Sequence, residues 1–111
     1  METVVKEFKH CNVIEITGRV DSSTAPLLSH TLEKICDDGH FKIVLDLTGL
    51  EYMSSAGLRA LLATQRTCKR YNRGEVVLAS VPVRNREALE LAGFTELFKI
   101  YENALAAVGN F

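Results

Sequence analysis

Residues 45–62 read LDLTGLEYMSSAGLRALL, and this stretch predicts a buried strand, a short polar turn and an amphipathic helix. The strand, residues 43–47, is nearly continuous in apolar residues, which is typical of a central strand covered on both faces. The helix is expected from about residue 55 to residue 71, with its end near residues 72–74. Its side chains expected in the core, at helical spacing, are Leu58, Leu61, Leu62 and Cys68.

Two serines, Ser54 and Ser55, stand where this helix begins. The first backbone N–H groups of a helix have no intrahelical partners, and the helix dipole is positive at that end. Serine is therefore a favoured N-cap residue, and a phosphate on it would lie in a favourable field. An ordinary cap explains a serine here without any function, so the residues alone leave open the choice between a cap and a phosphorylation switch.

The N-terminal part of the chain predicts a hairpin followed by a helix. Residues 4–8 and 13–17 alternate apolar with polar side chains around a polar turn, and Gly18 is expected to end the second strand. Capping side chains in residues 21–24 and Pro26 then predict a helix from about Ala25 to Asp37. The side chains of this helix expected to face the core are Leu27, Leu28, Leu32, Ile35 and Cys36.

The C-terminal part predicts a buried strand at residues 76–81, a short edge strand within residues 97–100 and a final helix at residues 103–109. Between the two strands, a helix is expected from about Arg84 to Ala92, with Gly93 as a left-handed cap. Its core-facing side chains are expected to be Ala88, Leu89 and Ala92. The whole pattern predicts one α/β domain over residues 1–111, with a mixed, mostly parallel sheet of four to five strands, flanking helices and an N-terminal hairpin.

Length and composition limit the classes of protein that fit. The chain has 111 residues, 47% of them hydrophobic, which suffices for one compact domain with a core but not for two. Its net charge of −1 provides no field that attracts nucleic acid or an anionic membrane. The cysteines Cys11, Cys36 and Cys68 form no CxxC pair and are odd in number, so we interpret them as small buried hydrophobes in a reducing cytosol.

The sequence does not predict a membrane protein. The N-terminal residues lack the long apolar core of a signal peptide, and no apolar run approaches the roughly 20 residues that cross a bilayer. We therefore expect a cytoplasmic protein with no direct membrane insertion.

The segment Ser54-Ser55-Ala56-Gly57-Leu58 resembles the signature of the STAS domain, the family of anti-sigma factor antagonists and related modules, which commonly reads Asp-Ser-Ser-Gly-Leu. Residues 18–21 resemble the Gly-x-Leu-Asp turn of the family, and residues 91–101 resemble its C-terminal stretch. The resemblance thus covers nearly the whole chain and implies a STAS-like fold. Two positions depart from the pattern: Ser54 stands where Asp is usual, and Ala56 replaces the second serine.

The resemblance also implies a function. Aligned on Gly57 and Leu58, the phosphoacceptor of the antagonists falls on Ser55, with Ser54 as a rival. Such a module is not an enzyme: unphosphorylated, it binds an anti-sigma factor and frees the sigma factor, and phosphorylation turns it off. The anti-sigma factor is itself the serine kinase, a phosphatase restores the active form, and ATP is the kinase's substrate, so this chain needs no cofactor. The residues predicted for partner binding are Asp21, Ser22, Ser23, Thr24, Met53, Ser54, Ser55, Gly57, Leu58 and Arg59.

A basic stripe is predicted along the helix that follows Ser55. Arginines recur at intervals of seven, four and three residues, which return to one helical face: Arg59, Arg66, Arg70 and Arg73. A solvated charged face explains this stripe as well as a docking surface for an acidic partner does. In the docking interpretation, Met53 and Leu58 are the apolar contacts if either is exposed.

Other chemistry fits the residues less well. A hydrolase nucleophile would sit in Gly-x-Ser-x-Gly, and Ser55 has no glycine two residues before it. The histidines, His10, His30 and His40, are scattered over a turn, a helix face and a loop. Asp21 and Asp46 follow strands and are too few for a metal shell, so we expect Asp21 to cap the first helix and Asp46 to accept bonds from loop N–H groups. In the family the matching aspartates lie near the phosphoacceptor.

One alternative function remains open at the level of the sequence. A STAS domain also serves as an adaptor subunit of a membrane transport complex, with no phosphorylation. Ser54 in place of the usual Asp is compatible with this alternative.

Overall fold

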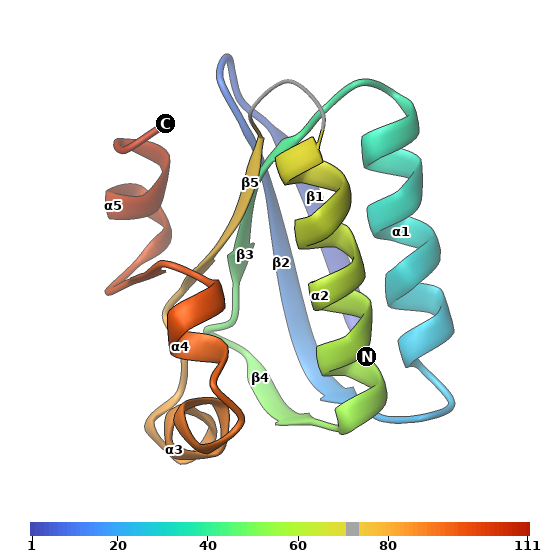
Figure 1. The fold of residues 1–111 in the computed structure, drawn as a ribbon, viewed down its shortest axis with the longest axis vertical. Helices are drawn as coiled ribbons and strands as arrows, with labels where there is room; N and C mark the ends of the chain where they lie inside the picture. The colour runs from blue at the N-terminus through green and yellow to red at the C-terminus, as the bar shows by residue number, and fades with distance from the viewer. Residues whose placement is uncertain (71–73) are drawn as a thin grey trace.

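The computed structural model describes residues 1–70 and 74–111, and it forms a mixed sheet with helices on both faces (Figure 1). The predicted end of the second long helix at residues 71–73, and with it Arg73, lies outside the described residues. The strands are β1 (Glu2–Glu7), β2 (Asn12–Val20), β3 (Lys42–Asp46), β4 (Leu50–Met53), β5 (Glu75–Ala79) and β6 (Ile100–Tyr101). The helices are α1 (Ala25–Asp37), α2 (Ser55–Arg70), α3 (Val83–Leu91), α4 (Phe94–Leu97) and α5 (Ala104–Val108).

The sheet has the order β1-β2-β3-β5-β6, and β4 pairs with the end of β2 beyond this path. Only β1 and β2 are antiparallel; the other described pairs are parallel. The predicted hairpin, the central position of β3 and the parallel pairing of β3 with β5 are confirmed. The sheet has six strands, rather than the four to five expected, because the four-residue strand β4 was not predicted.

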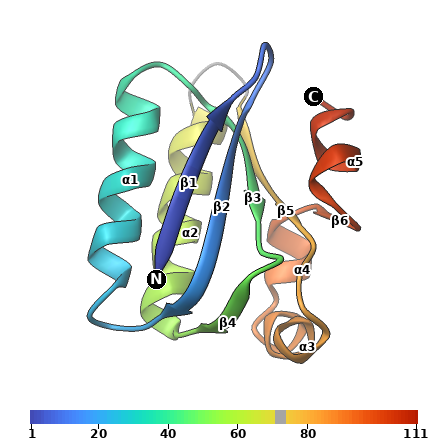
Figure 2. The same ribbon diagram turned by 180° about the vertical axis from the view of Figure 1, so that it is seen from behind.

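The long helices α1 and α2 lie side by side on one face of the sheet, and α5 lies on the other (Figures 1 and 2). The main core fills the space between the sheet and α1 and α2, and a smaller apolar cluster lies under α5. Within the parts of the chain that the structure describes, no helix has the length and apolar character that crossing a bilayer requires.

Four expectations about individual positions were wrong. Gly18 does not end β2: it has φ 91° at a register shift, where a bulge fits glycine, and the strand runs two residues further. Leu27 is 61% exposed, because the buried stripe of α1 passes through its neighbour Leu28 instead. Ala88 and Ala92 are exposed, because α3 lies at the end of the sheet and buries Leu89.

The apolar face of α2 is also narrower than expected: Leu58 and Leu62 are only partly buried. Thr64 and Gln65 are buried in addition to the predicted Leu61 and Cys68. The helix thus places polar side chains in the interior, and Gln65 shows why this is tolerated.

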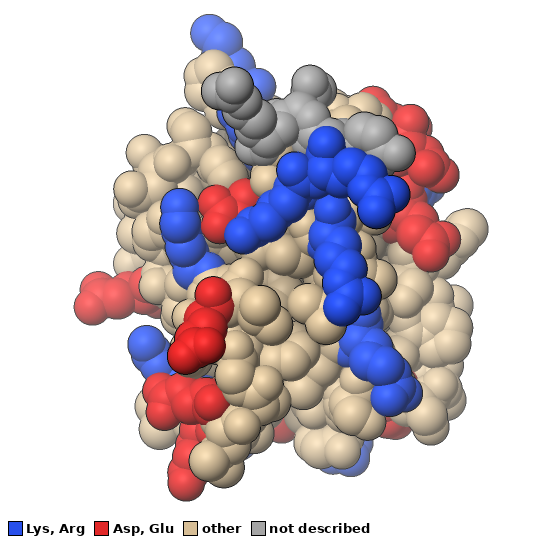
Figure 3. Space-filling model, in the orientation of Figure 1, with Lys and Arg blue, Asp and Glu red and all other residues tan. Residues whose placement is uncertain are grey.

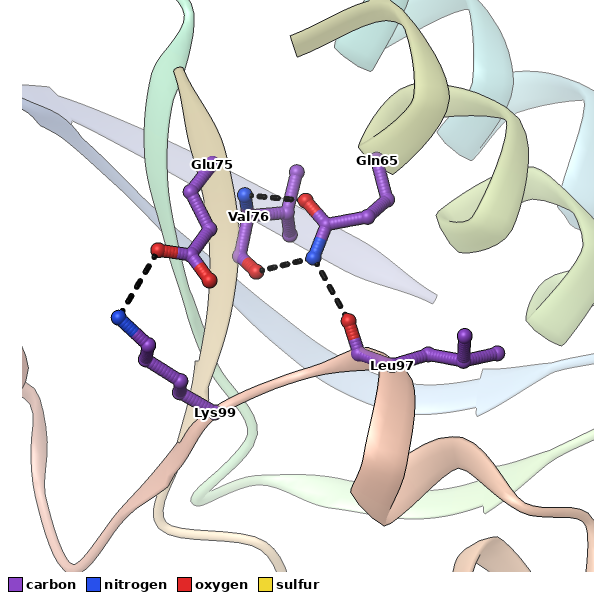
Figure 4. A network of polar contacts seen from close by, with 5 residues as sticks. All are labelled: Gln65, Glu75, Val76, Leu97 and Lys99. Carbon is purple, nitrogen blue, oxygen red and sulfur yellow. Dashed lines mark hydrogen bonds and ion pairs between the residues drawn. The ribbon is translucent and has the colours of Figure 1, made fainter. Parts of the chain in front are cut away.

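The amide of Gln65 joins α2 to two other elements (Figure 4). Its Oε1 accepts a hydrogen bond from the Val76 N–H at 2.7 Å, and its Nε2 donates to the carbonyls of Val76 at 3.0 Å and Leu97 at 2.9 Å. β6 pairs with β5 only at Leu78 and Ala79, so the side chain of Gln65 bonds backbone groups of β5 that no strand reaches on that side. A buried amide costs little when its groups are bonded in this way.

Candidate functional site

The predicted site residues come from two turns at one end of the domain. Val20 at the end of β2 is in register with Met53 at the end of β4, and the Ser54 N–H donates to the Val20 carbonyl at 2.8 Å. This pairing places the turn before α1, residues 21–24, beside the start of α2. Both helices therefore begin at the same end of the sheet, where parallel α/β sheets commonly bind ligands.

Ser54 and Ser55, at the start of α2, lie in different environments. Ser54 is the N-cap: its Oγ accepts the Gly57 N–H at 3.3 Å, and its carbonyl accepts the Leu58 N–H at 3.0 Å. Ser55 is the first residue of the helix and is exposed, whereas Ser54 is partly buried. The hydroxyl of Ser55 is thus free to meet another molecule at the positive end of the helix dipole.

Asp21 organises the turn that leads into α1. Its Oδ1 accepts hydrogen bonds from the Ser23 hydroxyl at 2.6 Å, the Ser23 N–H at 3.0 Å and the Thr24 N–H at 3.1 Å. The bonds from Ser23 and Thr24 lower the pKa of Asp21 from 3.8 to about 2, so this carboxylate is ionised at neutral pH. The expected capping of α1 by Asp21 was wrong: the N-cap position of α1 is Thr24, no side chain caps the helix there, and Asp21 instead bonds the turn that precedes it. Ser22 and Ser23 are exposed beside it.

Gly57 is fixed by tight packing at the start of α2. It is buried, and a Cβ added there would meet the sulfur of Met53 and the Cγ1 of Val20, the latter at 2.8 Å. Only glycine lets the first turn of α2 approach β2 and β4 this closely. Met53 and Leu58 are partly buried against the main core, so each exposes only part of its side chain at the site.

A polar hollow between α1 and α2 continues from the site. It is lined by both helices: Ser22, Ala25, Pro26, Ser29, His30 and Glu33, with Ala56 and Arg59. Apart from Ser22 and Arg59, these residues were not among those predicted for binding. The alignment of the two helices is a tertiary property, which no local pattern could have indicated.

Basic side chains line the exposed face of α2 (Figure 3). Arg59, Arg66 and Arg70 are all exposed, and Ser55 lies four residues before Arg59 on the same helical face. The predicted stripe is therefore present over the described residues, beginning one turn from Ser55.

Two further observations define the limits of the site. Asp46 accepts bonds from the N–H and hydroxyl of Thr48 at 3.1 and 2.6 Å, as expected. It is in register with Glu15 and lines a different hollow, which contains neither serine of the α2 start. Sequence reasoning missed the stacking of Arg19 on the ring of Tyr52, at 4.6 Å, where β2 and β4 pair beside the site.

Comparisons with known proteins agree with this geometry. The sequence model of the STAS domain matches residues 2–107. BtrV of Bordetella bronchiseptica, described by its name as an anti-sigma factor antagonist, is 35% identical over 96 residues, which are 86% of this chain and 82% of BtrV. The anti-sigma-F factor antagonist RsfB of Mycobacterium tuberculosis is 29% identical, over 80% of this chain and 71% of RsfB. The crystal structure of an anti-sigma factor antagonist from Mycobacterium paratuberculosis superposes with a TM-score of 0.88 at 25% identity, over 98% of this chain and 92% of that one.

Proposed function

This chain belongs to the STAS domain family and within it to the anti-sigma factor antagonists, and from that premise we propose that it is a phosphorylation-controlled binding protein. Unphosphorylated, it binds an anti-sigma factor through the turn before α1 and the start of α2. The bound anti-sigma factor releases its sigma factor. Phosphorylation of Ser55 by the anti-sigma factor, acting as an ATP-dependent serine kinase, ends the interaction, and a phosphatase restores it.

The observation that carries this proposal is the difference between the two serines. The Ser55 side chain is exposed at the first position of α2, whereas the Ser54 hydroxyl caps the helix. The departure of Ser54 from the usual Asp of the family is compatible with this role, because Ser and Asp are about equally good N-caps. The replacement keeps the cap and removes one negative charge beside the acceptor.

The mechanism needs only electrostatics and desolvation. A phosphoserine adds a charge of about −1.5 to −2, which a close contact with an acidic partner surface opposes by repulsion and by the cost of removing water. Arg59, four residues further along the same face, supplies the attraction that the unphosphorylated state uses. Each 1.4 kcal/mol of penalty weakens the affinity tenfold, so a few kcal/mol suffices to end binding.

The alternative function is that of an adaptor of a membrane transport complex without phosphorylation. One experiment separates the two functions, because the alternative predicts that no phosphate is added. The protein is incubated with its cognate anti-sigma factor and ATP, and the phosphorylated peptide is mapped by mass spectrometry. We expect one phosphate on Ser55, its loss in Ser55→Ala and its retention in Ser54→Ala. Phosphate on Ser54, Ser22 or Ser23 contradicts the site, and absence of phosphate favours the adaptor.

A further inference from the structure

Two cysteines face each other across the contact between α1 and α2. The Sγ atoms of Cys36 on α1 and Cys68 on α2 are 3.9 Å apart, and both are free thiols. A disulfide has an S–S length of about 2.05 Å, so the two sulfurs need to approach by about 2 Å to bond. Rotation of the two side chains, together with any shift of the packed helices, has to cover this distance.

One of the two thiols is open to small molecules. Cys36 is 8% exposed and lines a hollow between the helices, where Ala60 and Ala63 on α2 leave room. Cys68 is 0% exposed and lies within the same apolar core cluster. A small oxidant therefore reaches Cys36 first, and Cys68 is in place to react second.

We propose that Cys36 and Cys68 are a redox-responsive pair that closes to a disulfide tying α1 to α2 when the protein meets a hydroperoxide. The sulfur of Cys36 attacks the peroxide O–O bond, forming a sulfenic acid and releasing one water. The sulfur of Cys68 then attacks the sulfenic sulfur, forming the S–S bond and releasing a second water. In sum, two thiols and one hydrogen peroxide give one disulfide and two waters, and a dithiol reductant reverses the change.

The surroundings of the two cysteines determine how fast they react with a hydroperoxide. Burial raises the pKa of Cys36, the bond with Cys68 lowers it by less, and the carboxylates of Asp37 and Glu33 on the same helix each add a still smaller increase. Burial, with the neighbouring Cys36, raises the pKa of Cys68 to about 12. Because the thiolate is the reactive form, the pair responds to sustained oxidation rather than to a brief pulse.

The link would stiffen the layer that carries the binding site. It joins residues 32 positions apart, and cross-links of this span restrict mainly the unfolded chain. The oxidised protein is therefore expected to unfold at a temperature roughly 10 °C above the reduced protein. The start of each joined helix contributes residues to the proposed site, so oxidation acts on the same two elements as the partner.

The test uses the full chain, reduced, desalted and then treated with hydrogen peroxide. The protein is next unfolded, its remaining thiols are alkylated, and it is digested for mass spectrometry. We expect one alkylated thiol, that of Cys11, a linked peptide pair containing Cys36 and Cys68, reversal by dithiothreitol, and the higher unfolding temperature. Cys11 belongs to the cluster on the other face of the sheet, so Cys11→Ser is the matched control and should form the same link.

A second arm separates folded geometry from simple thiol reactivity. The same treatment in urea should link the three cysteines without preference, because the helices no longer hold Cys36 beside Cys68. Three alkylated thiols in the folded protein, links that involve Cys11, or an unfolding temperature that does not rise would each overturn the proposal. Neither arm depends on Ser55, so a failed phosphorylation switch leaves this result unaffected.

Discussion

At the scale of single residues, Ser54 and Ser55 are adjacent in the chain but have different physical roles. The hydroxyl of Ser54 satisfies a backbone N–H group that the helix itself cannot, so modification of that oxygen would disturb the helix start. Ser55 already adopts the helical conformation and projects from its first turn, so a phosphate there can be added while the cap stays in place. In the proposed function, this arrangement assigns folding and signalling to two neighbouring residues.

The cap leads to a stability prediction. Ser54→Ala should lower the free energy of unfolding by about 1 kcal/mol, because the Gly57 N–H loses its acceptor. Ser55→Ala should stay within about 0.5 kcal/mol of the parent, as is usual for exposed positions without such a role. Urea denaturation of both variants measures the difference. A larger loss for Ser55→Ala than for Ser54→Ala would mean that the cap has been assigned to the wrong serine.

Asp21 gives a prediction for acid stability. Because its pKa is lower in the folded protein than in the unfolded chain, its hydrogen bonds stabilise the fold above about pH 4, and this contribution is lost as the pH falls toward about 2. Asp21→Asn should be less stable than the parent at neutral pH and should lose less stability across that acid range. Thermal unfolding of both proteins at a series of pH values provides the comparison, and parallel curves would contradict the role given to Asp21.

At the scale of elements, α2 combines the proposed switch position, a charged face and a core face. Its exposed side carries Ser55 and then the arginines, and its buried side carries Leu61, Gln65 and Cys68. A partner that docks along the exposed side would meet the proposed acceptor, Ser55, at one end of the helix. The position of an arginine along α2 should therefore determine its effect on binding.

Charge reversal tests this graded effect. Arg59→Glu should weaken binding to the anti-sigma factor strongly, and the loss should deepen at low salt because an attraction has become a repulsion. Arg70→Glu is the matched control: it lies eleven residues further on, roughly 16 Å along the helix, which exceeds the screening length in physiological salt. Titration at two salt concentrations measures both variants. Equal losses, or none, would make the stripe an ordinary solvated face.

The long elements and the C-terminal helix α5 were predictable, whereas the short elements β4 and α4 were not. α1 and β3 have periodic or continuous apolar patterns over enough residues to be recognised, and the predicted bounds of α1 are confirmed. β4 has four residues and exposes Glu51 and Tyr52, so its sequence resembles that of a turn. Only its pairing with β2 in the structure identifies it as a strand. The edge strand was expected at residues 97–100, but Leu97 ends helix α4 and the strand β6 comprises Ile100 and Tyr101.

At the scale of the whole molecule, the site is a consequence of topology. The sequence indicates that two helices begin near Ala25 and Ser55, but only the pairing of β2 with β4 places those starts together. The same holds for the hollow between α1 and α2, and for Gln65, whose burial depends on backbone groups 11 and 32 residues away. Local patterns predict what each element is, and long-range pairing decides which of its residues meet.

The measurement that tests the central claim most directly compares Ser55→Ala with Ser55→Glu by thermal unfolding and by titration calorimetry against the anti-sigma factor. Ser55→Ala should fold and bind like the unphosphorylated parent. Ser55→Glu should fold as well or slightly better, because a carboxylate is favourable at a helix N-terminus, and should bind much more weakly. Stability and affinity would then change in opposite directions. Parent-like binding by a folded Ser55→Glu variant would contradict the switch and leave the protein as an adaptor.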